Sequence, residues 1–180
     1  GMTAKQCQAL REVDSETIDN ELHWLETENH YLIALDDPRY PPKLLQIDDP
    51  PLALYCVGEP KYLLAPQIAI VGSRNASSQG LDHAQQFAQA LSEAGFCIAS
   101  GLALGIDGAA HRGALLGQSG TIAVCATGLD RVYPARHRDL AHAIATQGCL
   151  ISEFTLGTQA IAGHFPKRNR LISALSLGVL

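Results

Sequence analysis

Apolar residues in the second half of the chain occur in short uninterrupted runs separated by longer amphipathic stretches. The runs cover residues 67–71, 96–99, 121–126 and 149–152, and the stretches cover 77–94, 107–116, 139–147 and 167–175. Apolar runs without polar alternation indicate strands buried on both faces, and the stretches have the spacing of helices. Strands that alternate with helices form parallel sheets. The pattern therefore predicts an α/β fold with helices on both sides of a mainly parallel sheet.

The first part of the chain follows a different pattern. Residues 14–29 have partial helical spacing, with Asp14 or Ser15 as the capping residue. Residues 36–52 are rich in proline and predict an ordered connector, and residues 52–57 predict a short strand. We therefore divide the chain into the remnant of an N-terminal helical domain (1–30), a connector with one strand (31–65) and the α/β domain (66–180). A fifth apolar run begins at residue 178, so we expect further strands to follow in the complete protein.

The composition is that of a globular protein, and together with the start of the chain it indicates where the protein acts in the cell. Of the 180 residues, 47% are hydrophobic and 17% are charged, which suits one folded domain with a short extension. The chain has no run of 18 apolar residues, and its start lacks the basic and apolar segments of a signal peptide. Its five cysteines include no CxxC spacing, so we expect them to be reduced and mostly buried. These features predict a cytoplasmic protein without membrane contact.

Charge is divided unevenly along the chain. The net charge is −5, but residues 1–65 carry 5 basic and 12 acidic side chains, whereas residues 66–180 carry 8 and 6. Every Lys and Arg of the second part except Arg112 lies on a connection that follows a predicted strand. Because parallel strands end at the same edge of a sheet, where such folds bind ligands, these cations are expected to form one basic rim. The rim predicts an anionic ligand.

Glycine-rich loops at the same edge favour phosphate binding. Residues 72–74 (GSR) and 100–107 (SGLALGID) follow the first two strands, and small residues there allow backbone N–H groups to approach an anion. Arg74 can bind a phosphate through two parallel hydrogen bonds. Tyr133 and Phe165 lie beside basic residues, where aromatic rings can stack on the bases of a single strand or can anchor their loops.

Motifs for cofactors, metals and catalysis are weak or absent. Neither GxGxxG nor GxxxxGK[ST] occurs, and the histidines lack metal-binding spacing, so no cofactor is predicted. Asp107 and His111 are spaced as a carboxylate–imidazole pair, but a helix-capping role for Asp107 is favoured. Glu153 can act as a general base or as the partner of an arginine.

Four blocks of sequence resemble, in order and spacing, the central domain of the DprA/Smf family of DNA-processing proteins. They read IAIVGSRNAS, ASGLALGIDGAAHRGAL, GLDRVYPARHRDL and ISEF…FPKRNRLISALS, and YPPKLLQIDDPPLALYCVGEP resembles the family's preceding segment. The match runs from about residue 24 to the end of the chain. The resemblance implies an extended, doubly wound Rossmann-like fold. It also implies a protein that binds and protects incoming single-stranded DNA, loads RecA in natural transformation, and forms a homodimer.

The resemblance also implies which residues meet DNA. They are Gly72, Ser73, Arg74, Ser100, Gly101, Tyr133, Arg136, Arg138, Phe165, Lys167, Arg168, Asn169 and Arg170. Ala135 stands where the family often has a lysine or a polar residue. The enzymatic alternative is a phosphoribohydrolase that cleaves nucleoside monophosphates with Asp107 or Glu153, although the PGGxGT block of that group is missing. A purely structural protein-interaction module is disfavoured by the basic rim.

Overall fold

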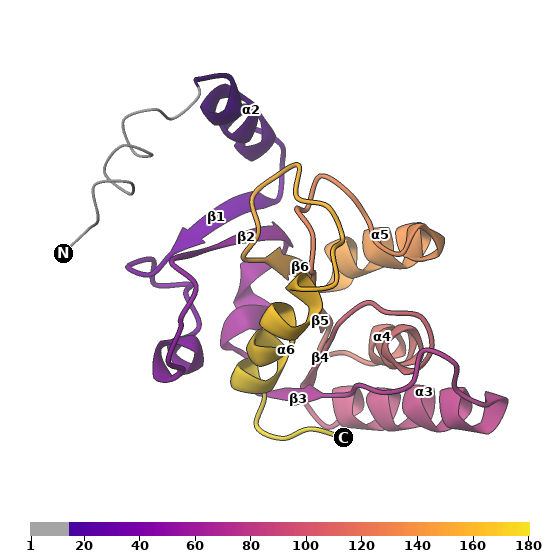
Figure 1. Ribbon diagram of the computed structural model, residues 1–180. Helices are drawn as coiled ribbons and strands as arrows, with labels where there is room; N and C mark the ends of the chain where they lie inside the picture. Colours follow the sequence, from indigo (N-terminus) through magenta and orange to yellow (C-terminus); the bar gives the residue numbers. More distant parts are fainter. Residues whose placement is uncertain (1–14) are drawn as a thin grey trace.

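The computed structural model describes residues 15–180, and Figure 1 shows how their helices and strands are arranged. Within these residues, six strands form one sheet in the order β1-β2-β6-β5-β4-β3. They are β1 His30–Ala34, β2 Ala53–Gly58, β3 Gln67–Ala69, β4 Cys97–Ser100, β5 Thr121–Val124 and β6 Cys149–Ser152. The helices are α2 Ser15–Leu25, α3 Ser78–Glu93, α4 Ile106–Leu116, α5 Arg138–Gln147 and α6 His164–Leu175, with short 3-10 helices η1 Pro42–Gln46, η2 Pro60–Leu64 and η3 Ala135–His137.

The four strands predicted in the second half of the chain are parallel to one another. β3 pairs with β4, β4 with β5, and β5 with β6, whereas β2 joins β6 in the antiparallel direction. Every residue of β4, β5 and β6 is buried, which explains why their apolar runs do not alternate with polar residues. The predicted α/β fold with a mainly parallel sheet is confirmed.

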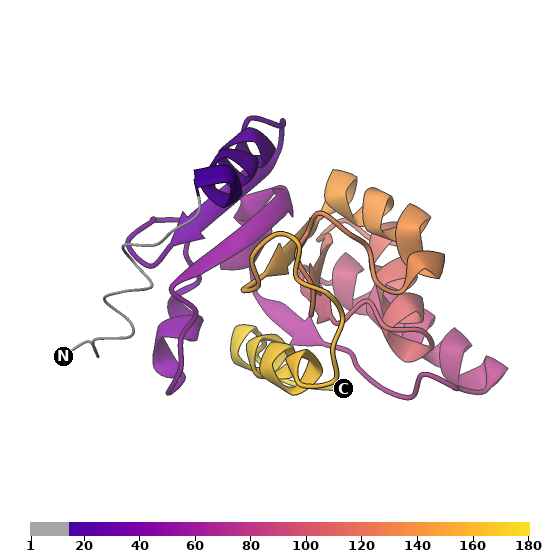
Figure 2. The ribbon, with the colours of Figure 1, turned by 45° about the horizontal axis from the view of Figure 1, so that its top comes forward.

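Helices cover both faces of the sheet, as Figure 2 shows. On one face, Leu140 and Ile144 of α5 pack against Ala123, and α3 and α4 lie on the same side beside Ile98. On the other face, α6 packs with η1 over the alternate side chains of the strands, and Leu171 contacts the cluster that holds Ile122. The sheet is therefore doubly wound.

The chain reverses its winding direction next to β3. Successive connections from β3 to β6 move across the sheet in one direction, but α6 returns the chain to the β3 side, where Val179 forms a parallel bridge with Ala69. β3 is thus the last of the six named strands, with β4 on one side and the bridge at Val179 on the other. Ligands of such sheets bind at the carboxyl ends of strands beside a reversal of this kind.

The N-terminal part differs from the prediction in two ways. α2 ends at Leu25 rather than at residue 29, and the unpredicted strand β1 forms a hairpin with β2. Through β2, this hairpin continues the sheet across the predicted boundary at residue 65. The three-part division of the chain therefore stays a prediction, and the proposed cap Asp14 lies outside the described residues.

The described cysteines are core residues. Cys56, Cys97, Cys125 and Cys149 are free and buried, as expected, and Cys7 lies outside the described residues. Between residues 15 and 180, no helix has both the length and the apolar character needed to cross a membrane.

Candidate nucleic-acid interface

Arg74 lies in the loop between β3 and α3, where its side chain is exposed. No carboxylate among residues 15–180 lies within 4.0 Å of its guanidinium group. Arg74 therefore pairs with neither Asp107 nor Glu153 in this structure. Its positive charge is available at the surface, next to the carboxyl end of β3.

Phe165 brings together three of the segments predicted to form the site. The guanidinium carbon of Arg74 lies 5.2 Å from the centroid of the Phe165 ring, and that of Arg168 lies 6.0 Å from it. The ring of Tyr133 is 5.9 Å from Phe165 between centroids, and Tyr133 is 50% exposed. These cation–π and aromatic contacts form a cluster at the surface, so Tyr133 is not a fully buried anchor.

Arg168 lies beneath this cluster instead of on the rim. Its side chain is only 4% exposed, and its Nη1 donates hydrogen bonds to the carbonyl oxygens of Gly101 and Val124. Its Nε donates to Asn169 Oδ1 at 3.0 Å. Burial lowers the pKa of Arg168, although a guanidinium group stays protonated in proteins. In contrast to the prediction, Arg168 holds the ends of β4 and β5 together.

The loop after β4 also differs from the expected phosphate-binding loop. Ser100 is fully buried, and its hydroxyl donates to the carbonyl oxygen of Ile70 at 2.6 Å. The backbone N–H groups of Gly101 and Ala103 donate to Asp107 Oδ2 at 3.1 and 3.3 Å. Ser100 and Gly101 therefore belong to the frame of the site and not to its surface. A Cβ atom on Gly101 would lie 2.3 Å from Nη1 of Arg168, so glycine lets the buried arginine approach.

Asp107 and His111 do not form the carboxylate–imidazole pair that their spacing suggests. Asp107 binds the preceding loop, and α4 begins at Ile106 after the N-cap residue Gly105, which provides no side-chain hydrogen bond. His111 Nδ1 lies 2.7 Å from Thr121 Oγ1, whose hydroxyl donates to the carbonyl oxygen of Ile98. This network assigns the imidazole proton to Nδ1. Burial lowers the pKa of His111 to about 3, so the ring is neutral at pH 7.

Glu153 and Arg170 form an ion pair close to the end of β6. Nη2 of Arg170 binds Glu153 Oε2 and lies 3.6 Å from Asp49 Oδ2 in the connector. Burial raises the pKa of Glu153, and the positive charge of Arg170 opposes that shift. Of the two roles considered for Glu153, the structure shows that of an arginine partner. Arg170 therefore contributes less free charge to the rim than predicted.

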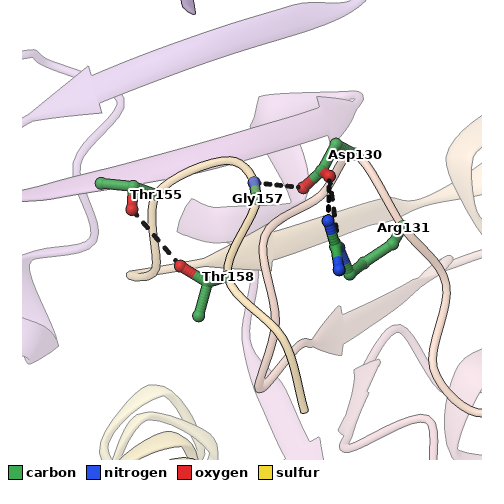
Figure 3. A network of polar contacts seen from close by, with 5 residues as sticks. All are labelled: Asp130, Arg131, Thr155, Gly157 and Thr158. Carbon is green, nitrogen blue, oxygen red and sulfur yellow. Dashed lines mark hydrogen bonds and ion pairs between the residues drawn. The ribbon is translucent and has the colours of Figure 1, made fainter. Parts of the chain in front are cut away.

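The loops after β5 and β6 are joined by Asp130, as Figure 3 shows. Asp130 Oδ1 accepts a hydrogen bond from the backbone N–H of Gly157 at 2.9 Å, while Oδ2 pairs with Nη2 of Arg131 at 2.9 Å. The hydroxyl groups of Thr155 and Thr158, on either side of Gly157, form a hydrogen bond at 3.3 Å. Arg131 is consequently neutralised, although the sequence places it on the basic rim.

The remaining predicted cations are exposed but do not lie in one place. Arg136, Arg138 and Lys167 have no carboxylate among the described residues within 4.0 Å. Arg138 lines a hollow of about 410 Å³ beside Asp130. Lys167 lies instead near the start of α6, the helix that also carries Phe165.

A separate hollow of about 240 Å³ lies beside Arg74. Its walls include Gly72, Arg74, Asp107, Asn169, Ile172 and Val179. At Gly72 a Cβ atom would lie 2.8 Å from Cγ1 of Ile106, so the absence of a side chain lets the backbone lie close to Ile106 at this wall of the hollow. Ser73 is exposed, and its hydroxyl accepts a hydrogen bond from the N–H of Asn75 at 3.1 Å. Of the predicted residues, only Gly72, Arg74, Arg168 and Asn169 line this hollow.

Six residues that line the hollow are not among the predicted DNA-binding residues: Val71, Ala103, Asp107, Ile172, Ser173 and Val179. The sequence suggests only a capping or an acid role for Asp107, and nothing in the local pattern marks the other five. α6 begins at His164, three residues before the predicted start, and this earlier start places Phe165 in its first turn. No group of three His, Cys, Asp or Glu side chains suited to a metal ion occurs within the described part of the chain.

Comparisons with known proteins give one consistent result. The family model for DNA recombination-mediator protein A matches residues 31–180. Protein Smf of Escherichia coli is 44% identical over 181 residues, a match that includes 100% of this chain and 48% of that protein. DNA processing protein DprA of Streptococcus pneumoniae is 42% identical over 144 residues, or 80% of this chain and 51% of that protein. The chain thus spans about half the length of these relatives.

Solved structures show the same relationship. The X-ray structure of DprA from Streptococcus pneumoniae matches 96% of this chain and 59% of its own, with a TM-score of 0.85 and 36% identity. A structure of DNA processing protein A from Helicobacter pylori, reported for its single-stranded DNA binding mode, matches 82% of this chain and 67% of its own. Its TM-score is 0.75 and its identity 36%. Family model, sequence relatives and fold agree, and the chain belongs to the DNA recombination-mediator protein A family.

Proposed function

We propose that this chain binds single-stranded DNA at the carboxyl ends of its parallel strands. The observation that carries the proposal is the cluster of Arg74, Tyr133 and Phe165 beside the 240 Å³ hollow. Exposed cations attract the phosphates of a strand, and exposed aromatic rings stack on its bases without strong sequence preference. The Helicobacter pylori relative, whose structure is described as binding single-stranded DNA, supports the proposal.

The biological role proposed for the whole protein follows from the family. The complete protein protects incoming single-stranded DNA, loads RecA onto it during natural transformation, acts in the cytoplasm and forms a homodimer. DNA processing is named for the DprA relatives of Streptococcus pneumoniae and Bacillus subtilis. Because the chain spans about half of such relatives, RecA loading and dimer formation are to be tested on the full-length protein.

A titration with matched single- and double-stranded oligonucleotides tests DNA binding by the chain. We expect the single strand to bind more tightly at equal salt, because the bases of a duplex are already stacked and paired and cannot enter the hollow. Fluorescence anisotropy measures both affinities. Equal affinities would indicate a nonspecific basic patch, and no binding to either form would refute the proposal.

We propose binding and not catalysis for this site. The two carboxylates considered as catalytic acids already have partners, since Asp107 holds the loop after β4 and Glu153 pairs with Arg170. Incubation with nucleoside monophosphates, followed by chromatography for released base, tests the phosphoribohydrolase alternative. We expect no released base above the rate of a protein-free sample.

A further inference from the structure

A second hollow, of about 480 Å³, lies between α2 and the loops that follow β5 and β6. It shares no lining residue with the hollow beside Arg74, so it is separate from the proposed DNA interface. Its volume falls within the range of about 300–1,000 Å³ that is usual for small-molecule sites. The wall on the loop side is held in place, because Asp130 accepts the backbone N–H of Gly157 there, as Figure 3 shows.

The wall of this hollow carries negative charge. Glu21 and Asp130 line it, whereas no lysine or arginine between residues 15 and 180 does. Asp130 pairs with Arg131, which lines other hollows. His23, the histidine of the wall, lies 3.3 Å from Glu26. The charge of Glu21 is therefore the one left without an ionic partner, and it favours a cation in the hollow.

Glu21 keeps one carboxylate oxygen available to a ligand. Its Oε2 accepts the hydroxyl of Tyr55 at 2.5 Å, and this bond fixes the direction of the side chain. Its Oε1 has no hydrogen bond to any residue between 15 and 180. Hydrogen bonds between a carboxylate and a charged N–H group are about twice as strong as neutral ones. A positively charged nitrogen is therefore the donor that suits Oε1 best.

Trp24 offers such a nitrogen a second favourable contact. Its ring lines the hollow and is held by the ring of His30, with 4.1 Å between centroids. Indole is the aromatic group that attracts ammonium and guanidinium ions most strongly. Leu156 adds apolar surface, and the side-chain oxygens of Asn20 and Thr27 are further acceptors. The wall thus combines a charged acceptor, an aromatic ring and an apolar surface.

This combination suits an organic cation better than a metal ion. Divalent metal ions need several oxygen ligands at fixed distances. Within the described part of the chain, no group of three His, Cys, Asp or Glu side chains has an arrangement that could supply them. An organic cation needs only one carboxylate for its charged nitrogen, and its carbon chain covers the aromatic and apolar parts of the wall.

We propose that this hollow binds an organic cation, a molecule with an ammonium or guanidinium group on an aliphatic chain. The charged nitrogen donates to Glu21 Oε1, and the chain lies against Trp24 and Leu156. Free polyamines have this chemistry, and so do the lysine and arginine side chains of a partner protein. Because the hollow lies between α2 and the loops after β5 and β6, its occupant fastens α2 to these loops. The proposal does not depend on DNA binding.

Isothermal titration calorimetry with two probes tests the proposal and separates the two sources of the cation. Spermidine represents a free polyamine, and Nα-acetyl-lysine amide represents the side chain of a partner protein. We expect a saturable heat with a stoichiometry of one for at least one probe. Saturation by spermidine alone would identify a polyamine, and saturation by the lysine amide would identify a side chain. Heats that equal those of potassium chloride at the same ionic strength for both probes would overturn the proposal.

A variant and a matched control locate the site. In Glu21→Gln the amide oxygen still accepts the hydroxyl of Tyr55, while an NH₂ group replaces the free oxygen. We expect the affinity for the cation to fall about tenfold or more, the effect of losing a hydrogen bond to a charged group. Asp19→Asn removes the same charge from an exposed position of α2 outside the hollow, and should retain the affinity within about twofold.

Retention of the wild-type affinity in Glu21→Gln would overturn the assignment to this hollow. Binding of single-stranded DNA without polyamine should be the same in Glu21→Gln and in the wild type, because Glu21 lies outside the hollow beside Arg74. Failure of the wild type to bind DNA would refute the proposed function and leave the cation site standing.

Discussion

At the scale of single residues, the role of each basic side chain depends on whether its charge already has a partner. Arg168 is bonded to two carbonyl oxygens, Arg170 to Glu153, and Arg131 to Asp130. Arg74 has no such partner among the described residues and lies over Phe165. The basic residues therefore fall into two groups: those whose charge is already paired within the fold, and those exposed without a partner. Only the second group can neutralise phosphates.

Arg74 is expected to contribute most to DNA affinity among single side chains. A charge-assisted hydrogen bond is worth about 1.5–3 kcal/mol, so Arg74→Ala should weaken single-strand binding by about ten- to a hundredfold. Arg74→Lys should restore only part of the affinity, because an ammonium group lacks the planar, two-pronged geometry of guanidinium. Anisotropy titrations at constant salt measure these differences.

Arg112→Ala provides a control of equal charge. Arg112 is exposed on α4 and lies on none of the connections that follow the strands. Its removal should change affinity by no more than about twofold. Since Arg74 has no ion pair with any residue between 15 and 180 and contacts only the half-buried ring of Phe165, Arg74→Ala should melt close to the wild-type temperature. A folded Arg74→Ala protein with wild-type affinity would remove the central residue of the proposed site.

His111 should make the protein less stable in mild acid. Its folded pKa of about 3 lies below the ordinary value of 6.5, because the buried ring cannot be charged without losing solvation. Below pH 6.5 the His111 ring is protonated in the unfolded chain but stays neutral in the folded chain. His111 therefore does not reduce the free energy of unfolding above pH 6.5. Between pH 6.5 and pH 3 it lowers that free energy by about 1.4 kcal/mol per pH unit.

Urea unfolding at several pH values between 7 and 4 measures this effect when the wild type is compared with His111→Asn. The variant retains an N–H donor for Thr121 but cannot be protonated, so its stability should depend less on pH. His83→Asn, at an exposed position on α3, should behave as the wild type does. Parallel curves for the wild type and His111→Asn would contradict the assignment.

At the scale of elements, the site depends on how the loop after β3 is held against the start of α4. The carbonyl oxygen of Ser73 accepts the N–H of Ile106 at 3.1 Å. Gly105 makes this contact possible, because its φ is +79° and a Cβ atom there would lie 2.1 Å from the Ser73 oxygen. The position of Arg74 is therefore linked to the first turn of α4.

Gly105→Ala should destabilise the fold by at least about 2 kcal/mol, through a left-handed backbone and a collision with the preceding loop. Because the loop must move, single-strand affinity should fall as well. Gly163→Ala is the matched control, since Gly163 has a φ of −68° and no atom within 4 Å of an added Cβ. Denaturant unfolding and anisotropy on both variants separate the effects, and equal stability of the two would contradict this account.

The sequence predicts the elements of the parallel core well because their signals are local. The runs that became β4, β5 and β6 are bounded by glycine and polar turn residues, and amphipathic spacing marks α3 within one residue at either end. β1 was missed because it is short, follows α2 after only four residues and buries only Ile33 fully. The early start of α6 was missed because His164 to Pro166 have no strong helical pattern.

At the scale of the whole molecule, four exposed cations without a described carboxylate partner lie on the connections at the carboxyl ends of the strands. They are Arg74, Arg136, Arg138 and Lys167. The acidic residues of the first part of the chain reverse the net charge to −5 without neutralising these positions. Affinity for DNA should thus reflect the local distribution of charge and not the overall pI.

Binding should weaken with salt in proportion to the phosphates that these cations neutralise. If three to four phosphates of a single strand are neutralised, the logarithm of the association constant should fall with the logarithm of salt at a slope of about −2 to −3. Titrations at several potassium chloride concentrations give the slope. A flat response would contradict the electrostatic part of the proposal.

The sequence predicts which loops form the candidate site, but not which of their residues are buried. The strand-end rule placed Arg74, Tyr133 and Phe165 together, because connections at the same edge of a parallel sheet meet. Burial of Arg168 and Ser100 could not be predicted, since arginine and serine are mostly exposed and nothing local distinguishes a buried one. Gly101 was the one available signal, and it was attributed to phosphate instead of to the arginine that it accommodates.

Trp24 of α2 is the single tryptophan of the chain. Its ring centroid lies 4.1 Å from that of His30 and 5.8 Å from that of Tyr55. None of these three aromatic residues lines the hollow beside Arg74. The intrinsic fluorescence of the protein therefore reports how α2 is seated on the β1-β2 hairpin, while a labelled oligonucleotide reports the strand-end site. Trp24 also lines a hollow with Asp130 and Gly157, so its emission is sensitive to the loops after β5 and β6 as well. Two optical signals can thus follow the seating of α2 and the binding of DNA in one sample.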